Sequence, residues 1–406
     1  MRRKYLLYFL SITSAFLTAS AISCDTYLSV TYIRDPWILG TTLFLTGILT
    51  AIPLMIGFCI KINKKFLGTL IDPQFRGFIF PKGDFLKNIL IASSANALSS
   101  ILYFIIVTNI PDPSAVLAFS SLTPAYLIIT DIIIEKEHPS LVEVQSILII
   151  TLGVLLVSLS LGTIDLIQLA IVLGPYNLSI VLFNIATREL RRTRAKSTYY
   201  DSLNIRFWLI IFSTLIFIIL ELMTNPPSIV TKSISFLPIY FPLLALDMTL
   251  TFFAYAAYIR ALAIGKTSIV NALASLSTIF GLGFSIAFSY MLPGIFRVKY
   301  PLFTWIIKIF GIFLALSGTI ALSLTEVKAL VFIKVRAGRP SNILELLFKI
   351  HGIEAVSAVA GRWDYILYIK LRTIKQAYYI ITNELSKIPN IIDIIWVTIL
   401  REYETV

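Results

Sequence analysis

The chain has 406 residues, of which 57% are hydrophobic and only 14% are charged. Soluble domains carry about 25% charged residues, so this composition excludes an ordinary soluble enzyme and predicts a multi-span membrane protein. A net charge of +12 would by itself be compatible with nucleic-acid binding. The basic residues, however, are distributed along the chain as in a membrane protein, so we expect no nucleic-acid partner.

Apolar runs of about 20 residues, the length that crosses a bilayer, recur through the first 325 residues. They predict an α-helical polytopic membrane protein with ten transmembrane helices, at 5–24, 37–60, 85–109, 113–134, 141–161, 164–188, 203–224, 237–260, 267–290 and 302–324. The first run follows "MRRK" and could instead be a cleaved signal segment, which would leave nine spans.

Basic residues predict the orientation of these spans. With the N-terminus in the cytoplasm, the inside segments hold eighteen Lys and Arg residues. The outside loops hold four, namely Arg34, Lys232, Arg297 and Lys299. This asymmetry is the positive-inside signal, so we expect a cell-membrane protein in the lipid bilayer with both termini cytoplasmic.

The two halves of the helical region share a short repeat. "SAVLAFSSLTP" (114–124) aligns with "SIVNALASLST" (268–278) at an offset of 154, with five of eleven positions identical. Each copy falls on the fourth span of a five-span half, 1–162 or 163–325. Because five is odd, the second half is inserted upside down, as in many secondary transporters.

The stretches "YFIIVTNIPDPSAVLAFSSLTPAYLIITDIIIEKEHPS" and "YIRALAIGKTSIVNALASLSTIFGLGFSIAF" resemble the EamA type of the drug/metabolite transporter superfamily. The resemblance implies ten spans from two inverted five-helix repeats and transport of small metabolites. The family often has a glutamate after the fourth span of each half. Glu135 or Glu137 matches it in the first half, whereas "SYMLPGIFRVKY" in the second half has no acid.

Polar residues inside the spans are candidates for the substrate-binding site. Two stripes at helical spacing lie in the third and eighth spans and correspond at an offset of 155. With two positions of the ninth span, the candidates are Asn96, Ser100, Tyr103, Asp247, Thr251, Tyr255, Tyr258, Asn271 and Ser275. A mid-span carboxylate is costly in lipid, so Asp247 is a candidate proton site or ammonium-binding group, the alternative being a structural acid bonded to a hydroxyl.

Two further features of the spans have structural interpretations. Lys308 in the last span is expected to extend its ammonium to the membrane interface. Pro124, and Pro175 with Gly174, are expected to loosen their helices by freeing backbone carbonyls.

Beyond Glu326 the pattern changes to that of a soluble domain. Strands are predicted at 328–336, 353–360, 363–370 and 391–402, with helices at 340–350 and 373–387. The order βαββαβ predicts an α+β ferredoxin-like domain over 327–406.

The stretches "HGIEAVSAVAGRWDYILYIKL" and "LSKIPNIIDIIWVTILREY" resemble the effector-binding domain of Lrp/AsnC-type regulators. The resemblance implies a homodimer formed through the sheets and a small effector, often an amino acid, near the turn residues Gly361 and Asp364. Local turn chemistry explains these two residues equally well. No helix-turn-helix segment precedes the domain, so DNA binding is not expected.

The sequence therefore favours a multi-pass secondary transporter of small metabolites, with amino acids as candidates, that works by alternating access and carries a cytoplasmic effector-sensing or dimerisation domain. The alternative is a membrane-anchored amino-acid sensor that does not transport. Cys24 and Cys59 lie in apolar segments, His138 and His351 lie far apart, and no catalytic motif is visible. We therefore expect no enzymatic activity, no metal and no cofactor.

Overall fold

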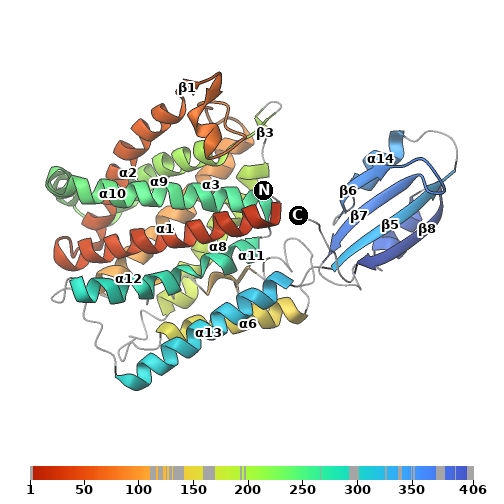
Figure 1. The fold of residues 1–406 in the computed structure, drawn as a ribbon. Helices are drawn as coiled ribbons and strands as arrows, with labels where there is room; N and C mark the ends of the chain where they lie inside the picture. The colour runs from red at the N-terminus through yellow and green to blue at the C-terminus, as the bar shows by residue number, and fades with distance from the viewer. Residues whose placement is uncertain are drawn as a thin grey trace. The chain divides into compact units, whose positions relative to one another are not determined.

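A computed structural model describes the chain in two compact units, a helical unit (Met1–Lys136 and Ser146–Thr319) and a second unit that contains the C-terminal sheet (Glu137–Gln145 and Ile320–Val406) (Figure 1). The described residues are 3–109, 116–117, 122–124, 126–127, 130, 141–158, 170–192, 194–195, 198–265, 267–291, 301–324, 327–336, 341–348, 350, 353–371, 380–388 and 390–399.

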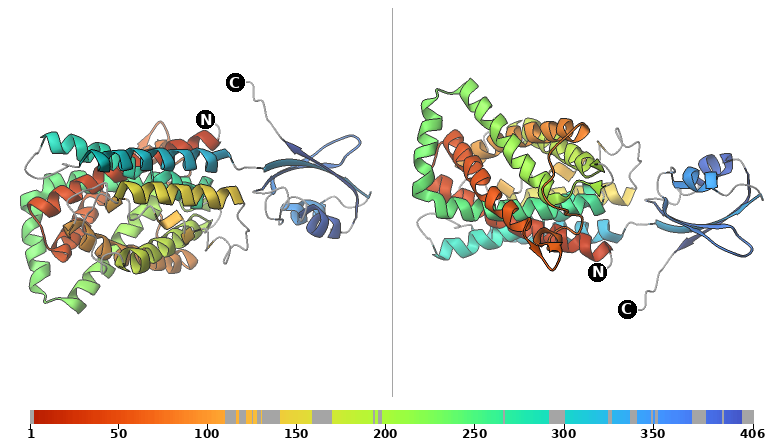
Figure 2. Two further views of the ribbon diagram at one scale, coloured as in Figure 1. Left: turned by 90° about the horizontal axis from the view of Figure 1, so that it is seen from below. Right: turned by 90° about the horizontal axis from the view of Figure 1, so that it is seen from above.

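The helical unit is a bundle of mostly long helices (Figures 1 and 2). Its described helices are α1 (Arg3–Thr31), α2 (Pro36–Phe58), α3 (Asp84–Asn109), α6 (Leu141–Ser158), α8 (Asn177–Arg192), α9 (Ser202–Thr224), α10 (Ser228–Ile264), α11 (Thr267–Ala274), α12 (Ser277–Met291) and α13 (Leu302–Leu324). Two-residue strands form the hairpins β1–β2 (Lys61–Ile62, Lys65–Phe66) and β3–β4 (Arg194–Ala195, Thr198–Tyr199), and a 3₁₀ turn, η1, spans Leu67–Leu70.

Large apolar side chains lie on the outside of this bundle. On α13, Phe303 and Phe313 are 72% and 66% exposed, and Ile56 on α2 is 64% exposed. Such exposure is a liability in water, but it is what lipid requires of a spanning helix. In the described part of the chain, six helical stretches are long and apolar enough to cross a membrane: Tyr5–Thr31, Pro36–Phe58, Asp84–Asn109, Ser202–Thr224, Ser228–Ile264 and Ile269–Met291.

Several predicted spans differ from the observed helices in their bounds. The first helix continues to Thr31 instead of ending at residue 24, and α10 begins at Ser228 instead of 237. The predicted ninth span is divided into α11 and α12. Helices α6 and α13 match predicted spans, although their apolar stretches are shorter. The predicted fourth span, with the repeat copy at 114–124, lies mostly outside the described residues, so ten helices remain a prediction.

The break predicted at Pro175 is present. Residues Val172–Tyr176 form a π-helical turn, η2, directly before α8. Two carbonyls of this turn accept side-chain hydrogen bonds: Val172 O from Asn177 Nδ2 at 2.7 Å, and Leu173 O from the Tyr126 hydroxyl at 2.6 Å. The loosened backbone is therefore satisfied by neighbouring side chains.

The prediction for Lys308 is wrong. Its side chain is fully buried on α13, at 0% exposure, so the ammonium does not extend to the membrane interface. A side chain that points into the bundle cannot snorkel along a lipid-facing surface, and sequence spacing alone did not reveal which way this one points.

A polar cluster lies where the loop after η1 meets the end of α8 and the start of α9. Asp72 and Arg191 form an ion pair with 3.3 Å between Oδ2 and Nη1, and their side chains are only 1% and 5% exposed. The same Asp72 oxygen accepts from the Ser202 amide at 2.8 Å and from its hydroxyl at 2.7 Å. These bonds fasten the loop to both helices.

The sheet of the second unit has the order β6-β7-β5-β8, with all neighbouring strands antiparallel. Its elements are β5 (Val327–Val335), α14 (Ser341–Phe348), β6 (Ile353–Ala358), β7 (Tyr365–Leu371), the π-helical turn η3 (Ile380–Glu384), the 3₁₀ turn η4 (Leu385–Lys387) and β8 (Ile391–Ile399). Helical elements cover one face only (Figure 2), where Ile343, Leu347 and Leu385 pack on Val331 and Leu367. The strand order is that of the predicted split βαββαβ motif. The predicted second helix, 373–387, lies partly outside the described residues, and its described part forms the turns η3 and η4.

Candidate functional site

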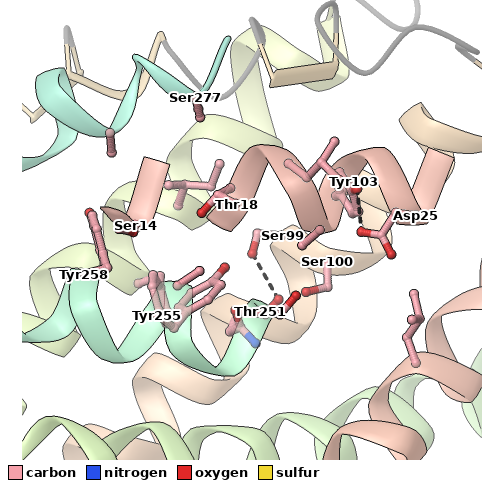
Figure 3. Close-up of a pocket in the computed structure, with 18 of the residues that line it drawn as sticks. Ser14, Thr18, Asp25, Ser99, Ser100, Tyr103, Thr251, Tyr255, Tyr258 and Ser277 are labelled. Carbon is pink, nitrogen blue, oxygen red and sulfur yellow. Dashed lines mark hydrogen bonds between the residues drawn. The ribbon is translucent and has the colours of Figure 1, made fainter. Parts of the chain in front are cut away.

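The helical unit contains a cavity of about 250 Å³ lined by residues of α1, α2, α3, η2, α8, α9, α10, α11 and α12. Hydroxyl-bearing side chains from different helices point into it (Figure 3). Ser14 and Thr18 come from α1, Ser99 and Ser100 from α3, and Thr251 from α10. The volume is just below the usual range for small-molecule sites, so it suits a small metabolite.

All nine residues predicted to form the substrate site line this cavity: Asn96, Ser100, Tyr103, Asp247, Thr251, Tyr255, Tyr258, Asn271 and Ser275. The two helical stripes predicted from spacing therefore face the same space, one from α3 and one from α10. Their role in binding stays a prediction.

One part of the cavity holds two carboxyl groups. The Tyr103 hydroxyl donates to Asp25 Oδ2 at 2.7 Å. Asp247, only 1% exposed, lies within hydrogen-bonding reach of the Asp25 carboxyl. The Oδ1 atoms of both aspartates are buried and have no hydrogen-bond partner among the described residues. Two adjacent carboxylates repel each other, so this pair is suited to hold a proton or a cation.

The sequence did not reveal Asp25. The predicted first span ended at residue 24, directly before Asp25, whereas α1 continues for two more turns. The signal was the apolar run that resumes after it, with Tyr27, Leu28 and Val30. From the sequence alone, a carboxylate between two apolar stretches looks like the end of a helix, because the sequence does not show the cavity that the carboxylate faces.

Another part of the cavity contains a network of amides. The Tyr258 hydroxyl donates to Asn184 Oδ1 at 2.5 Å, and Asn184 Nδ2 donates to Asn271 Oδ1 at 3.2 Å. Asn271 Nδ2 donates in turn to the carbonyl of Thr267. This chain links α8, α10 and α11 through groups that remain neutral.

A guanidinium group completes the lining. Arg206, one turn into α9, is 3% exposed, and its Cζ lies 4.3 Å from the centre of the Tyr255 ring. No hydrogen bond or ion pair of this guanidinium occurs among the described residues, and its Nε is buried without a partner. Sequence reasoning counted Arg206 only among the basic residues that set the orientation.

The chemistry available here is binding. Within the described residues, no group of three or more His, Cys, Asp or Glu side chains could hold a metal ion. The cavity presents one cationic group, one pair of carboxyls and many neutral hydroxyls and amides. Such a set can orient a small polar ligand with charges of both signs.

In the sheet unit, the predicted effector residues lie in the turn between β6 and β7. Gly361 has φ +152, a conformation that favours glycine. Asp364 Oδ2 accepts from the Val335 amide at 2.7 Å, and the Asp364 amide donates to Ile333 O at 3.0 Å. Asp364 thus fixes the end of β5 through contacts distant in sequence, whereas the turn interpretation expected bonds to amides of its own turn. The role of either residue in effector binding stays a prediction.

One family comparison concerns this sheet unit alone. Residues 328–405 match the Lrp/AsnC ligand binding domain. The C-terminal unit is thus a ligand-binding domain of this family, as its sequence predicted. The match does not extend into the helical unit, where the resemblance to EamA transporters stays a prediction.

Two other comparisons concern the whole chain. No curated protein matches it at a significant level. A solved structure titled "Crystal structure of protein" covers 77% of this chain and 98% of its own, with 13% sequence identity and a TM-score of 0.48.

Proposed function

We propose that this protein is a secondary transporter of small polar metabolites, with amino acids as candidates, whose two helical halves are inverted repeats that alternate around the cavity. The observation that carries the proposal is the cavity itself, with two buried carboxyls whose Oδ1 atoms lack a partner among the described residues. Unpaired carboxyls in a membrane-embedded bundle are costly, so a function has to offset that cost.

Helix packing supports the repeat. If α1, α2 and α3 correspond to α8, α9 and α10, each contact should recur in the other half. Helix α1 packs on α10 and α8 packs on α3; α2 packs on α10 and α9 packs on α3. These reciprocal pairs are what a two-fold axis between the halves produces.

Two residue-level details support the same symmetry. Tyr103 and Tyr258 correspond at the offset of 155; the first bonds Asp25 of α1 and the second bonds Asn184 of α8. Gly153 and Gly311 also correspond, and a Cβ on Gly153 would lie 2.5 Å from the Gly311 carbonyl oxygen. Equivalent residues meet where a two-fold axis passes between them.

The sheet domain would couple ligand sensing to transport. An effector changes transport only if it binds more tightly to one state of the carrier than to another. The uncovered face of the sheet exposes Ile395 and Val397 on β8, which supports the homodimer that the family resemblance implies. A membrane-anchored sensor that does not transport is the second candidate, favoured by the presence of this domain.

Uptake and counterflow of a metabolite panel in proteoliposomes test the proposal. We expect Asp247→Asn to abolish transport or to uncouple it from pH, because the acid pair then holds one titratable group fewer. Glu221→Gln is the matched control: Glu221 is also buried within a span, is bonded by Thr41 and lies outside the cavity lining. Normal transport by Asp247→Asn with an unchanged pH profile contradicts the role of the acid. No transport of any compound by the wild type, with effector binding retained, favours the sensor.

A further inference from the structure

The cavity separates its opposite charges along one helix. Asp247 and Tyr255 lie eight residues apart on α10, which corresponds to about 12 Å along the helix axis. Asp247 adjoins Asp25, and Tyr255 carries the Arg206 guanidinium over its ring. The residues of α10 that hold the acid pair and contact the guanidinium are therefore about two turns apart, and in the described part of the chain no ion pair joins Arg206 to either aspartate.

Arg206 lacks the partner that a buried cation normally has. A charge removed from water without compensation costs several kcal/mol, and buried charges in proteins are usually paired. Among the described residues, the one electrostatic contact of its side chain is the cation–π contact with the Tyr255 ring. Its Nε donates no hydrogen bond there. A guanidinium presents a planar donor fork that matches a carboxylate.

Resting on the proposed transport function, we propose that Arg206 is the anion anchor of this cavity and that the substrate is an elongated amino carboxylate. Its carboxylate binds Arg206, and its ammonium binds the pair Asp25 and Asp247. Taking the rise of about 12 Å between Asp247 and Tyr255 as the separation of the charges, and subtracting a hydrogen bond of about 3 Å at each end, leaves about 6 Å between the two charged groups of the ligand. A simple α-amino acid places both charges on one carbon and is too short. An ω-amino acid, or lysine bound through its side-chain ammonium, spans the distance.

A ligand series of graded length measures this spacing. Binding to the purified protein is measured for glycine, 4-aminobutyrate, 5-aminovalerate, 6-aminohexanoate and lysine, with pentylamine and pentanoate as singly charged references. We expect affinity to rise with length and to be highest among the compounds with five or six carbons. Tighter binding of glycine than of every longer compound, or no binding by any member of the series, overturns the proposal.

Substitution of the anchor supplies the second arm. Arg206→Gln should weaken binding of the best amino carboxylate by roughly 10- to 100-fold, since a charged hydrogen-bonding partner is lost, and should leave pentylamine unaffected. Arg206→Lys should restore part of the affinity. Lys87→Gln, which removes an exposed positive charge outside the cavity, should change nothing. Without ligand, Arg206→Gln should melt at a higher temperature than wild type, because an unpaired buried charge is gone.

The ligand series and the Arg206 variants distinguish a failure of the anion anchor from a failure of the proposed transport function. Unchanged affinity in Arg206→Gln overturns the anchor even where transport persists. Length-dependent binding that Arg206→Gln abolishes, without movement of the compound across proteoliposomes, supports the anchor and refutes transport.

Discussion

The buried ion pair between Asp72 and Arg191 provides a direct test of what holds the ends of α8 and α9 to the preceding loop. We expect Asp72→Asn to lower the free energy of unfolding by about 3–5 kcal/mol, the usual cost of leaving a buried charge without its partner. The substitution keeps the shape of the side chain, and Arg191 then keeps its bonds to Tyr200 O at 2.8 Å and Gln74 Oε1 at 3.0 Å. The loss of stability therefore measures the effect of removing the charge and not the effect of creating a cavity.

The reverse substitution should cost less. In Arg191→Met the Asp72 carboxylate keeps the hydrogen bonds from Ser202 and from the Gln74 amide. We expect a loss of about 2–3 kcal/mol, the penalty for an incompletely satisfied buried charge. The double variant removes both charges, and its cost should fall short of the sum by at least about 1.5 kcal/mol.

Unfolding of the purified protein by SDS titration in mixed micelles, followed by far-ultraviolet circular dichroism, measures all four forms. Additivity within about 0.5 kcal/mol would refute the reasoning, since independent sites behave in that way. The pH supplies a check. Burial raises the pKa of Asp72, but the Arg191 guanidinium and the hydrogen bonds from Ser202 and Gln74 outweigh burial and hold it below the ordinary value. The pair's contribution is thus present above pH 4 and is lost only as the pH falls through the lowered pKa, so the cost of Asp72→Asn should be constant from pH 5 to 8.

Two further predictions concern neighbouring features. Burial raises the pKa of Asp201, the N-cap of α9, to about 6 from 3.8. The protonated Asp201 therefore contributes about 3 kcal/mol to the free energy of unfolding below pH 4, and this contribution is lost as the pH rises through 6. Melting temperatures between pH 4 and 7.5 should show this loss in wild type and not in Asp201→Asn, and equal profiles would contradict it. Gly153→Leu should disrupt the crossing of α6 and α13 at Gly311 and lower the melting temperature by several degrees or more. Gly57→Leu is the control and should be neutral, because a Cβ on Gly57 meets nothing within 4 Å. Equal melting temperatures of the two variants would contradict the close approach of Gly153 to Gly311.

The sheet domain could be predicted from the sequence in most of its detail. Strand periodicity is local and alternates strictly around one turn, so β6 and β7 were expected within two residues of their observed bounds. The order β6-β7-β5-β8 follows once a split βαββαβ motif is assumed. The bond from Val335 to Asp364 could not be predicted, because it joins residues far apart in the sequence.

In the helical unit the sequence predicted the positions of helices better than their ends or faces. The stripes at Asn96 and Asp247 were found because helical spacing places such residues on one face. Asp25 and Arg206 were missed because a charged residue near the end of an apolar run reads as a boundary or as a topology signal. Lys308 was misjudged for a different reason: the side of a helix that meets a neighbour depends on packing, and hydropathy does not encode it.

The two groups of buried charge in this unit differ in a way that bears on function. Where its role is structural, the chain brings opposite charges into contact, as Asp72 and Arg191 at 3.3 Å. In the cavity it does the opposite, placing two carboxyls beside each other and a guanidinium about two helical turns away. Carrying both unpaired groups costs stability, and that cost is offset only when a third molecule with charges of both signs lies between them. On the proposal that Arg206 anchors a carboxylate, the spacing of the charges selects the ligand, and the length series measures that spacing directly.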